Sequence, residues 1–522
     1  MSDLVTLTID RVPVTVPKGT TIIEAAKQAG ILVPHYCYHP SLSAPALCRM
    51  CLVEVEKAPK LMPACVTAVA DGQVVHVHGD TALKAREGVL ELLLINHPLD
   101  CPICDQAGEC ELQNFVFQEG RAGTRYAEYP KRFNPVEEFG PDVLYVPNRC
   151  ILCTRCVRFM DELAQDEVLN VSERGDRAYI GIAPDQLLDH PWSGNVVDLC
   201  PVGSLISKDF LHKARAWDLD KTASVCPGCS QGCNITIDTR DEVVVRLRPR
   251  PNLEVNRHFM CDHGRMDYRW MNRGDRVEAP LQRRDDRMQA IDWESALDAF
   301  VDLVAAARSA VVLASGRAST ESLGWTRGLA IATGRVTAAV RVPRGGEAPL
   351  PGIPNLALRA ERAPNGAGAR LAGYDAEWDS ALAAAGSADL TLLLDVELSD
   401  QEADAVRRCK TVVRLATLEE DRFQAELVLP VTTMAEENGT YLNRDHRIQR
   451  FLQARPGPGM ARPAWWVAAE TWSRLAEGRD APGSAAEAFA ALGQEIEELA
   501  GLRYEELGLT GRALAPASAD AG

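Results

Sequence analysis

The sequence predicts a multidomain protein that is α+β in its first half and α/β in its second half. Three observations predict this class. A hairpin, a helix and further strands follow one another in the first 79 residues; fifteen of the sixteen cysteines lie at or before Cys261; and helices alternate with short apolar strands after about Val277. A chain of 522 residues with a 46% apolar fraction is also long enough for about three or four domains with more than one hydrophobic core.

The composition excludes several functional classes. The net charge is −17, which argues against nucleic-acid binding, because phosphate binding depends on clustered positive charge. No apolar stretch approaches the roughly 18 residues of a membrane span. Residues 1–30 lack the basic-then-apolar order of a signal peptide. We therefore expect a cytoplasmic protein that meets a membrane only through a larger complex.

The first element is a β-hairpin followed by a helix. Residues 5–10 and 12–16 alternate apolar and polar side chains around a short turn, which is typical of a hairpin with one buried face. Thr21 with Glu24 three residues later fits a capping box, and Gly30 suits the C-terminal end of the helix.

Strands resume at residues 51–56 and 73–78, so hairpin, helix and strands together predict a β-grasp domain. A second helix is expected over residues 81–96, ended by Pro98. The leucines expected to pack inward on that helix are Leu90, Leu93 and Leu94. From there to about residue 220 the pattern is rich in loops, as expected where metal clusters rather than a large apolar core hold the fold.

The second half has the pattern of an α/β domain with a largely parallel sheet. Helices such as the one expected at residues 293–307 alternate with apolar strands, which are expected at 310–314, 390–395 and 411–414. The Pro- and Gly-rich stretch 343–373 is expected to be a long loop, and residues 515–522 a frayed tail.

The cysteines fall into sets that are typical of metal ligands, because thiols in a reducing cytoplasm rarely form structural disulfides. Three close cysteines and one remote partner in the first set can wrap a planar [2Fe–2S] cluster. The spacing differs from that of plant-type ferredoxins, and zinc is the alternative. The first set is Cys37-x10-Cys48-x2-Cys51-x13-Cys65.

The second set contains three cysteines and no fourth. His97 could simply end a helix, since Asn96-His97-Pro98 would do so. Because every other nearby cysteine has partners, His97 is the simplest fourth ligand of a [4Fe–4S] cluster, although zinc also accepts three thiolates and an imidazole. The second set is His97-x3-Cys101-x2-Cys104-x5-Cys110.

The third set, Cys150-x2-Cys153-x2-Cys156 with Cys200-Pro201 after 43 residues, is similar to the bacterial ferredoxin run for a [4Fe–4S] cubane. Zinc sites more often use two separated pairs, so zinc is the weaker alternative here.

The fourth set also combines three close ligands with one remote one, which fits a cubane better than a tetrahedral ion. It is Cys226-x2-Cys229-x3-Cys233-x27-Cys261. Only Cys409 is left over, at the start of an apolar strand, and we expect it to be an unligated thiol.

These four spacings, in this order, resemble those of the G-subunit family of bacterial NADH-quinone oxidoreductase, respiratory complex I, whose mitochondrial counterpart is the 75 kDa iron–sulfur subunit. The first three sets, within residues 1 to about 217, are specific to this family and its hydrogenase relatives. The fourth set matches a cluster of some bacterial members and of molybdopterin enzymes.

The second half resembles the molybdopterin oxidoreductase fold. The best match runs from Leu429-Pro430 through Glu436, Gly439-Thr440 and residues 443–449. Where cofactor-binding members have a Gly/Asn turn after a strand, this chain has Asp395-Val396-Glu397. Acidic residues there would repel a pyrophosphate, so we expect a degenerate scaffold that binds no molybdopterin.

The resemblance implies an electron-transfer subunit with one [2Fe–2S] cluster and three [4Fe–4S] clusters and with no catalytic residue of its own. Without a GxGxxG or P-loop pattern, NADH and flavin are expected on a partner chain. Electrons would enter at the Cys37 cluster, pass to the Cys150 cluster and then the His97 cluster, and leave toward quinone; the Cys226 cluster would lie off that line.

The implied partners are the flavin/NADH-binding subunit, the thioredoxin-like [2Fe–2S] subunit, the ferredoxin-like subunit and the 49 kDa-type subunit. The implied location is peripheral, on the cytoplasmic side of the inner membrane. Arg49, Arg155 and Arg158, inside or beside the ligand loops, are candidates for tuning the clusters, with surface solubility as the alternative for each.

Three other functions remain to be compared. An iron-only hydrogenase would need more cysteines downstream than Cys409. A catalytic subunit of an NAD-linked formate dehydrogenase would need a longer molybdopterin domain with an active-site thiol or selenol. A zinc-stapled scaffold would be colourless.

The expected division of the chain follows the ligand sets. It comprises a [2Fe–2S] domain at 1–79, a one-histidine three-cysteine domain at 80–120, a ferredoxin-like domain at 121–219, a molybdopterin-oxidoreductase-type [4Fe–4S] domain at 220–276 and a truncated molybdopterin-oxidoreductase-like domain at 277–522.

Overall fold

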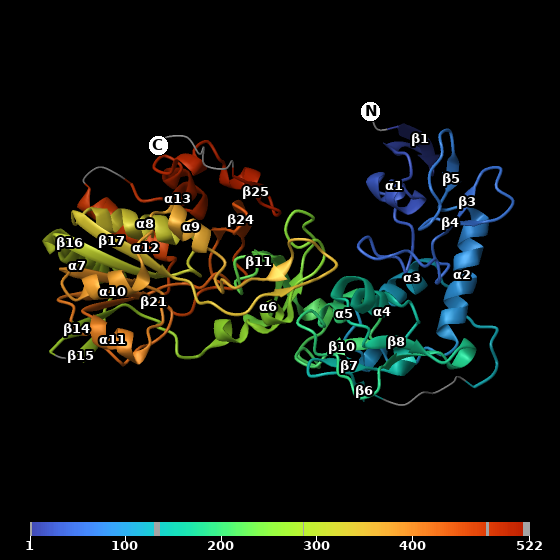
Figure 1. Ribbon diagram of the computed structural model, residues 1–522, viewed down its shortest axis with the longest axis horizontal. Helices are drawn as coiled ribbons and strands as arrows, with labels where there is room; N and C mark the ends of the chain where they lie inside the picture. The colour runs from blue at the N-terminus through green and yellow to red at the C-terminus, as the bar shows by residue number, and fades with distance from the viewer. Residues whose placement is uncertain (1–2, 130–135, 286, 477–479, 515–522) are drawn as a thin grey trace. The chain divides into compact units, whose positions relative to one another are not determined.

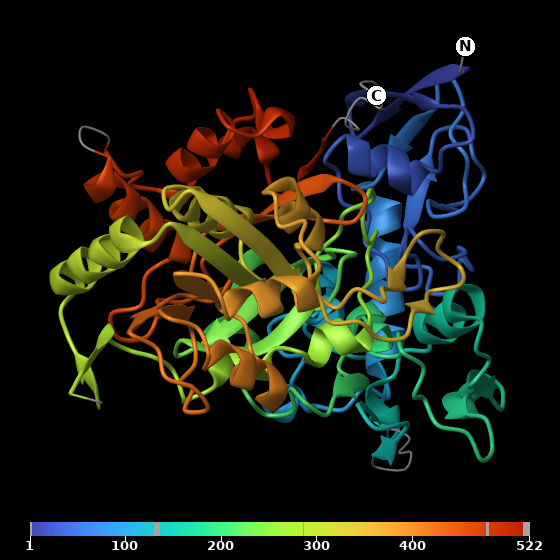
Figure 2. The same ribbon diagram turned by 60° about the vertical axis from the view of Figure 1, so that its left-hand side comes forward.

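The computed structural model describes residues 3–129, 136–285, 287–476 and 480–514. The chain divides into two compact units, which Figures 1 and 2 show in two views. The first unit comprises residues 1–219 with 350–354, and the second comprises 220–349 with 355–522. In the part of the chain that the structure describes, no helix is both long and apolar enough to cross a bilayer.

The first unit begins with a five-stranded sheet in the order β2-β1-β5-β3-β4. Strand β1 pairs antiparallel with β2 and parallel with β5, and helix α1 packs its apolar face on the sheet. This arrangement confirms the predicted hairpin, helix and strands. The elements are β1 Leu4–Ile9, β2 Val12–Pro17, α1 Ile22–Gln28, β3 Leu52–Val55, β4 Met62–Pro63 and β5 Val74–His76.

The ends of α1 agree only in part with the sequence prediction. Thr21 is the N-cap residue, but its hydroxyl makes no capping bond, and Glu24 instead accepts a hydrogen bond from Tyr38. The predicted capping box is therefore wrong. The carbonyls of Thr67 and Ala64 already accept the first two helical N–H groups, so no side-chain cap is needed.

The C-terminal end of α1 is as predicted. Gly30 has a φ of +72°, the left-handed conformation that glycine adopts without strain. Its N–H donates to Lys27, and the N–H of Ile31 donates to Ala26 at 2.9 Å, which makes a Schellman motif.

Helix α2, Asp80–Leu94, is packed through Leu90 and the fully buried Arg86. Leu93 is partly buried, whereas Leu94 is 37% exposed, so the prediction that Leu94 packs inward is wrong. Arg86 donates to the carbonyls of β3 Leu52 and of Val77 at 3.1 and 2.8 Å, and it pairs with Glu119. Arg86 thus ties the first sheet to α2 and to α3, Glu111–Glu119.

The rest of the first unit is rich in loops, as predicted. A three-stranded sheet has the order β10-β7-β6, and β8 pairs with β9. A single-turn 3-10 helix at Cys101–Ile103 precedes α3. The other elements are β6 Glu137–Glu138, β7 Val143–Tyr145, α4 Arg155–Arg158, a π-helical turn Phe159–Ala164, β8 Leu169–Ser172, β9 Tyr179–Ile182, α5 Asn195–Leu199 and β10 Leu205–Ser207.

The second unit starts with an antiparallel three-stranded sheet, followed by a short helix. It then forms a seven-stranded sheet in the order β15-β14-β22-β21-β20-β16-β17, in which the five strands from β22 to β17 are parallel. The elements are β11 Asp220–Val225, β12 Asn234–Arg240, β13 Val243–Pro249, α6 Asp262–Met266, β14 Leu281–Arg284, β15 Arg287–Ala290, β16 Ser309–Ser315, β17 Arg335–Arg341, β20 Leu390–Leu394, β21 Val412–Ala416 and β22 Leu427–Pro430.

Helices cover both faces of this sheet, as the two-residue period of a strand requires. Val312 faces one cluster with α7, α8 and α12, whereas its neighbours Val311 and Leu313 face another with α10 and α11. The predicted α/β domain with a largely parallel sheet is confirmed. The helices are α7 Trp293–Ala306, α8 Thr320–Ile331, α10 Trp378–Ala385, α11 Asp400–Val406 and α12 Ala464–Leu475.

The predicted long loop at 343–373 is partly wrong. It contains the paired strands β18 Ala348–Pro349 and β19 Ala357–Leu358 and the helix α9 Gly366–Leu371. The small residues of α9 are buried, and this packing overrides the low helix propensity of its two glycines. The remaining elements are β23 Gly439–Leu442, β24 Arg447–Phe451, α13 Ala485–Leu492 and β25 Arg512–Ala513. The tail predicted at 515–522 lies outside the described residues.

Candidate iron–sulfur sites

The first set gathers as two hydrogen-bonded thiol pairs. Cys37 lies against Cys48, and Cys51 against Cys65. The hydrogen bond from Cys37 lowers the pKa of Cys48 to about 5, and the bond from Cys51 likewise lowers the pKa of Cys65. The N–H of Tyr36 also donates to Sγ of Cys48 at 3.5 Å. Two thiol pairs match the two irons of a [2Fe–2S] cluster, each of which takes two protein ligands.

The second set surrounds a cavity of about 120 Å³ between α2 and α3. His97 and the thiols of Cys101, Cys104 and Cys110 all line it. Nδ1 of His97 is buried and has no hydrogen-bond partner, and burial, helped by the nearby Arg149, lowers the pKa of His97. A neutral imidazole with an unpartnered nitrogen beside three thiols suits a metal cluster.

Two residues distant in sequence complete the wall of this cavity. Gly203 lines it, and a side chain at that position would collide with Sγ of Cys104. Arg149 also lines it and donates to Asp100 at 2.9 Å and to the carbonyl of Gly203 at 3.4 Å. The second site is therefore closed by the segments that precede Cys150 and follow Cys200.

The third set is buried more deeply. Its four thiols line a small cavity of about 20 Å³ together with Tyr145 and Ser204. Burial raises the pKa of Cys150, while hydrogen bonds from Leu152 N–H, Tyr145 and Ser204 act in the opposite direction. Thr154 and Leu152 have positive φ of 59° and 51°, which curl the loop so that its three cysteines face one point.

The fourth set lies beside α6 in the second unit. All four thiols are buried, and burial raises the pKa of Cys261 to about 12. Cys261 caps α6 and accepts a hydrogen bond from the N–H of Gly264 at 3.4 Å. A Cβ at Gly264 would lie 2.8 Å from Sγ of Cys226, so only glycine permits this close approach.

The first three sets meet in one apolar cluster. Cys37, Cys110 and Cys153, one from each set, pack together with Tyr36 and Met50. The second and third sets also share backbone contacts, because the N–H of Glu111 donates to the carbonyl of Pro201 at 3.0 Å. The fold thus places three ligand sets around a common, water-excluding core.

Three observations fit iron–sulfur clusters. The donors are mostly thiols, Nδ1 of His97 is buried without a hydrogen-bond partner, and Gly203 and Gly264 leave room beside the thiols of Cys104 and Cys226. Among the described residues, no group of His, Cys, Asp or Glu is arranged to hold a single metal ion. Cys409 is half-buried against the helical cluster of the α/β domain, far along the chain from the ligand sets.

The three candidate tuning arginines differ in position. Arg49 is exposed, which agrees with a solubility role. Arg155 is buried and binds the carboxylate of Glu111 and the carbonyl of Leu199. Arg158 binds the backbone of two ligand loops. Surface solubility therefore does not explain Arg155 or Arg158.

Sequence reasoning missed Arg149, Tyr145 and Gly203. Arg149 immediately precedes Cys150, and Gly203 follows Cys200-Pro201, so proximity to the ligands was the available signal. Tyr145 carried none, because only its strand pairing with β10 brings it to the third set.

The α/β domain has a cavity of about 510 Å³ at the carboxyl ends of its parallel strands. This is where open α/β sheets bind ligands. Asp395 follows β20 there with a φ of +46°, and its carboxylate accepts from the N–H and hydroxyl of Thr417 at 3.0 and 2.6 Å. The turn after β20 is thus left-handed at Asp395, an acidic residue where Gly or Asn is expected in cofactor-binding members.

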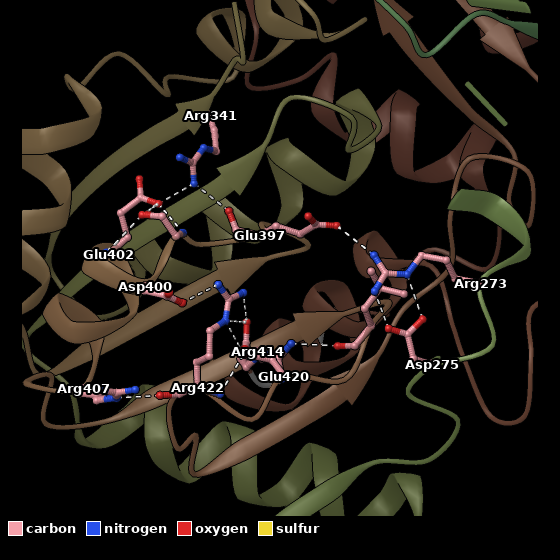
Figure 3. Close-up of polar contacts among 12 residues, drawn as sticks. Arg273, Asp275, Arg341, Glu397, Asp400, Glu402, Arg407, Arg414, Glu420 and Arg422 are labelled. Carbon is pink, nitrogen blue, oxygen red and sulfur yellow. Dashed lines mark hydrogen bonds and ion pairs between the residues drawn. The ribbon is translucent and has the colours of Figure 1, made fainter. Parts of the chain in front are cut away.

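Most arginines lining this cavity are already neutralised, as Figure 3 shows for several. Within the described part of the chain, only Arg362 and Arg414 of the lining arginines lack a carboxylate partner. The paired ones are Arg273 with Asp275, Arg276 with Glu436, Arg317 with Asp267, Arg341 with Glu402 and Arg422 with Glu420. Little free positive charge is left for a pyrophosphate.

Five protein-family models match successive parts of the chain. A 2Fe-2S iron-sulfur cluster binding domain matches residues 2–79, an NADH-ubiquinone oxidoreductase-G iron-sulfur binding region 86–125, and an NADH-quinone oxidoreductase subunit 3 ferredoxin-like domain 140–206. A molybdopterin oxidoreductase Fe4S4 domain matches 219–273, and molybdopterin oxidoreductase 352–472. The predicted fold class is confirmed.

Curated relatives match a little over half of the chain. The NADH-quinone oxidoreductase G subunit of Rickettsia bellii is 42% identical over 301 residues, which are 58% of this chain and 44% of that protein. The mitochondrial NADH dehydrogenase iron-sulfur protein 1 of Solanum tuberosum is 44% identical over 56% of this chain and 40% of that protein. The 78 kDa NADH-ubiquinone oxidoreductase subunit of Neurospora crassa is 41% identical over 65% of this chain and 46% of that protein.

The chain thus spans less than half the length of the curated relatives it matches. A solved structure, an NAD+-reducing [NiFe]-hydrogenase in the H2-reduced state, is 29% identical with a TM-score of 0.37, covering 40% of this chain and 90% of that chain. The predicted resemblance to the G-subunit family is confirmed by the curated homologues.

Proposed function

We propose that this chain, which is homologous to NADH-quinone oxidoreductase G subunits over about 300 residues, is an iron–sulfur electron-transfer subunit of such a complex. The observation that carries the proposal is the packing of three ligand sets around one apolar cluster. Such packing excludes water between neighbouring redox sites and holds them at fixed separations.

The proposed ligands are the sixteen predicted ones. Cys37, Cys48, Cys51 and Cys65 would hold a [2Fe–2S] cluster, and the sets headed by His97, Cys150 and Cys226 would each hold a [4Fe–4S] cluster. Bound there, the clusters would supply one-electron carriers from a flavin subunit to a ferredoxin-like subunit, in the order Cys37 set, Cys150 set, His97 set. The chain's own residues set the potentials through N–H···S bonds, nearby arginines and burial.

Electrons would leave by the face that carries the second set. Cys101 is exposed there, and Leu99 and Ile103 in its ligand loop are 96% and 63% exposed. Phe117 on α3 is 93% exposed. Large apolar side chains in water mark a protein interface, so Leu99→Glu should weaken binding of the ferredoxin-like subunit without loss of iron.

The fourth set would lie off the electron path, because it belongs to the second unit and takes no part in the shared apolar cluster. Replacing Cys261 with alanine should remove one [4Fe–4S] signal and loosen the segment after Lys221, since a metal site contributes folding free energy. Turnover should survive in complexes that still assemble.

The α/β domain would be a scaffold that binds no molybdopterin, because its cleft arginines are mostly paired with carboxylates. The proposed partners are the flavin/NADH-binding, thioredoxin-like, ferredoxin-like and 49 kDa-type subunits. The proposed location is the cytoplasmic side of the inner membrane, held there by the complex. The five-part division at residues 79, 120, 219 and 276 is retained as a proposal.

Metal and sulfide analysis of the anaerobically purified chain tests the function. We expect about fourteen irons per chain, matching acid-labile sulfide, and neither molybdenum nor flavin. Stoichiometric zinc in place of iron would overturn the electron-transfer function, and molybdenum or tungsten would favour a formate dehydrogenase.

A further inference from the structure

The helix that follows the third cysteine set reaches back to the loop of the first set. Helix α4 continues into the π-helical turn Phe159–Ala164, and π-turns often mark functional sites. Arg158 lies at their junction. Its Nη2 donates to the carbonyl of Cys37 at 2.5 Å and to the carbonyl of Cys153 at 3.3 Å. One guanidinium nitrogen therefore binds a ligand residue of each set.

A second contact strengthens this bridge. Nη1 of Arg158 donates to the carbonyl of Ser43. Glu162, one turn later, accepts hydrogen bonds from the N–H of Ser43 at 2.8 Å and from its hydroxyl. Both backbone polar groups of Ser43 are thus held by the same helical segment, and the loop from Cys37 to Ser43 cannot shift without breaking them.

The charge of Arg158 is not neutralised by an ion pair. No carboxylate in the described ranges pairs with it, and its Nε donates to the hydroxyl of Thr154 at 3.2 Å. Arg155, by contrast, is paired with Glu111. Burial lowers the pKa of Arg158, but a guanidinium stays protonated in proteins, so a full positive charge lies between the two sets.

We propose that Arg158 is a positioning residue that fixes the gap between the first and third cysteine sets and places a positive charge in it, an inference that rests on the proposed function. Clusters bound at the first and third sets would exchange one electron across this gap, so Arg158 would lie beside both the donor and the acceptor. The rate of electron tunnelling falls exponentially with distance. By binding the backbone of both sets, Arg158 would therefore fix the distance on which the rate of electron transfer depends. The charge favours the reduced, more negative form on either side.

The two roles separate with two substitutions. Arg158→Lys keeps the charge but lacks the planar fork that binds several carbonyls. Arg158→Gln removes both. Arg49→Gln is the matched control, because Arg49 is exposed in the first ligand loop and its loss changes the charge without touching the bridge. Glu162→Gln weakens the hold on Ser43 and also removes a negative charge that acts on Arg158.

The experiment uses the full chain, reconstituted anaerobically with iron and sulfide and reduced with dithionite. Arg158→Gln should keep the iron content, lower the potentials of both signals, weaken their magnetic interaction, and raise exchange of the Ser43 amide about tenfold, equivalent to about 1.4 kcal/mol. Arg158→Lys should restore the potentials but not the magnetic interaction. Glu162→Gln should raise the amide exchange and leave the magnetic interaction unchanged, and Arg49→Gln should change neither the exchange nor the interaction.

The results of this experiment separate failure of the positioning role of Arg158 from failure of the proposed electron-transfer function. A wild-type chain that takes up no iron overturns the proposed function and the inference together. A fully loaded Arg158→Gln chain with unchanged magnetic interaction and exchange overturns the positioning role alone. If Arg158→Gln loses iron, the iron-loaded Arg158→Lys chain is measured instead. A magnetic interaction equal to that of the wild type in this variant overturns the inference, and a weakened one supports it.

Discussion

The ligand-rich first unit and the α/β domain of the second unit are held together differently. In the cluster shared by the first three ligand sets, three of the nine buried residues are cysteines. The main core of the α/β domain contains aliphatic and aromatic side chains from four helices and the sheet, with no cysteine. Thiols therefore occupy positions in the first unit that hydrophobic side chains fill in the α/β domain.

This difference predicts that removing metal destabilises the first unit and leaves the α/β domain folded. Thiols buried around a cavity contribute little to the free energy of folding until a metal binds. Burial of apolar area, by contrast, stabilises the fold directly, by about 25 cal/mol per Å². Perturbing each region in turn tests this difference.

Removing the metal should have the largest effect. Structural metal sites contribute on the order of 10 kcal/mol to folding, so a chain prepared without iron should lose protection across residues 37–261 while the α/β domain stays protected. Hydrogen exchange measured by mass spectrometry on iron-loaded and iron-free chains checks this. Equal protection in both preparations would mean that the first unit folds without iron.

A large-to-small change in the α/β core should have the opposite effect: it should destabilise the α/β domain and leave the first unit unchanged. Phe300 on α7 is fully buried, and Phe300→Ala should lower the free energy of unfolding of this domain by about 3–5 kcal/mol. Chemical unfolding followed with a probe in this domain gives the value. The iron signals should not change, and their loss would show that the two regions fold as one.

Buried carboxyls should give the α/β domain its own pH dependence. Burial raises the pKa of Glu437 to about 8, opposed by the hydroxyl of Thr432 at 2.7 Å, and burial raises the pKa of Glu321 to about 7. Each folded-state pKa lies above the unfolded value. The contribution to stability is therefore full below about pH 4.5 and is lost as the pH rises toward 8, by about 1.4 kcal/mol per unit and per group.

Glu437→Gln should flatten this decline up to about pH 8. Glu321→Gln should flatten only the part below about pH 7, which makes it the matched control. Urea unfolding of this domain between pH 5.5 and 8.5 measures both slopes. A Glu437→Gln slope equal to that of the wild type would place the titration on other groups.

Changing His97 to cysteine should have the smallest effect on stability, because a fourth thiol still completes the second set. A thiolate adds negative charge, which disfavours the reduced state, so the potential of that cluster should fall. Redox titration followed by electron paramagnetic resonance checks this. His97→Ala should instead leave a labile cluster. An unaltered spectrum and potential in both variants would exclude His97 as a ligand.

Sequence alone could predict which residues gather in the second and third sets, because most members of each set are close in sequence. Three cysteines within a few residues must converge, and the sheet cores follow from alternation of apolar residues. It could not predict Gly203 or Tyr145, whose roles depend on chain segments folding back to the sets. The capping box at Thr21 failed for a similar reason, because remote carbonyls already satisfy the helix.

The wall of the His97 cavity has a consequence for how the chain is made. Its ligands lie between residues 97 and 110, but Arg149 and Gly203 close it. A ribosome has therefore delivered every ligand of the second set well before the site is sealed. Until residue 203 has emerged and folded back, the nascent chain leaves this wall of the site open to solvent.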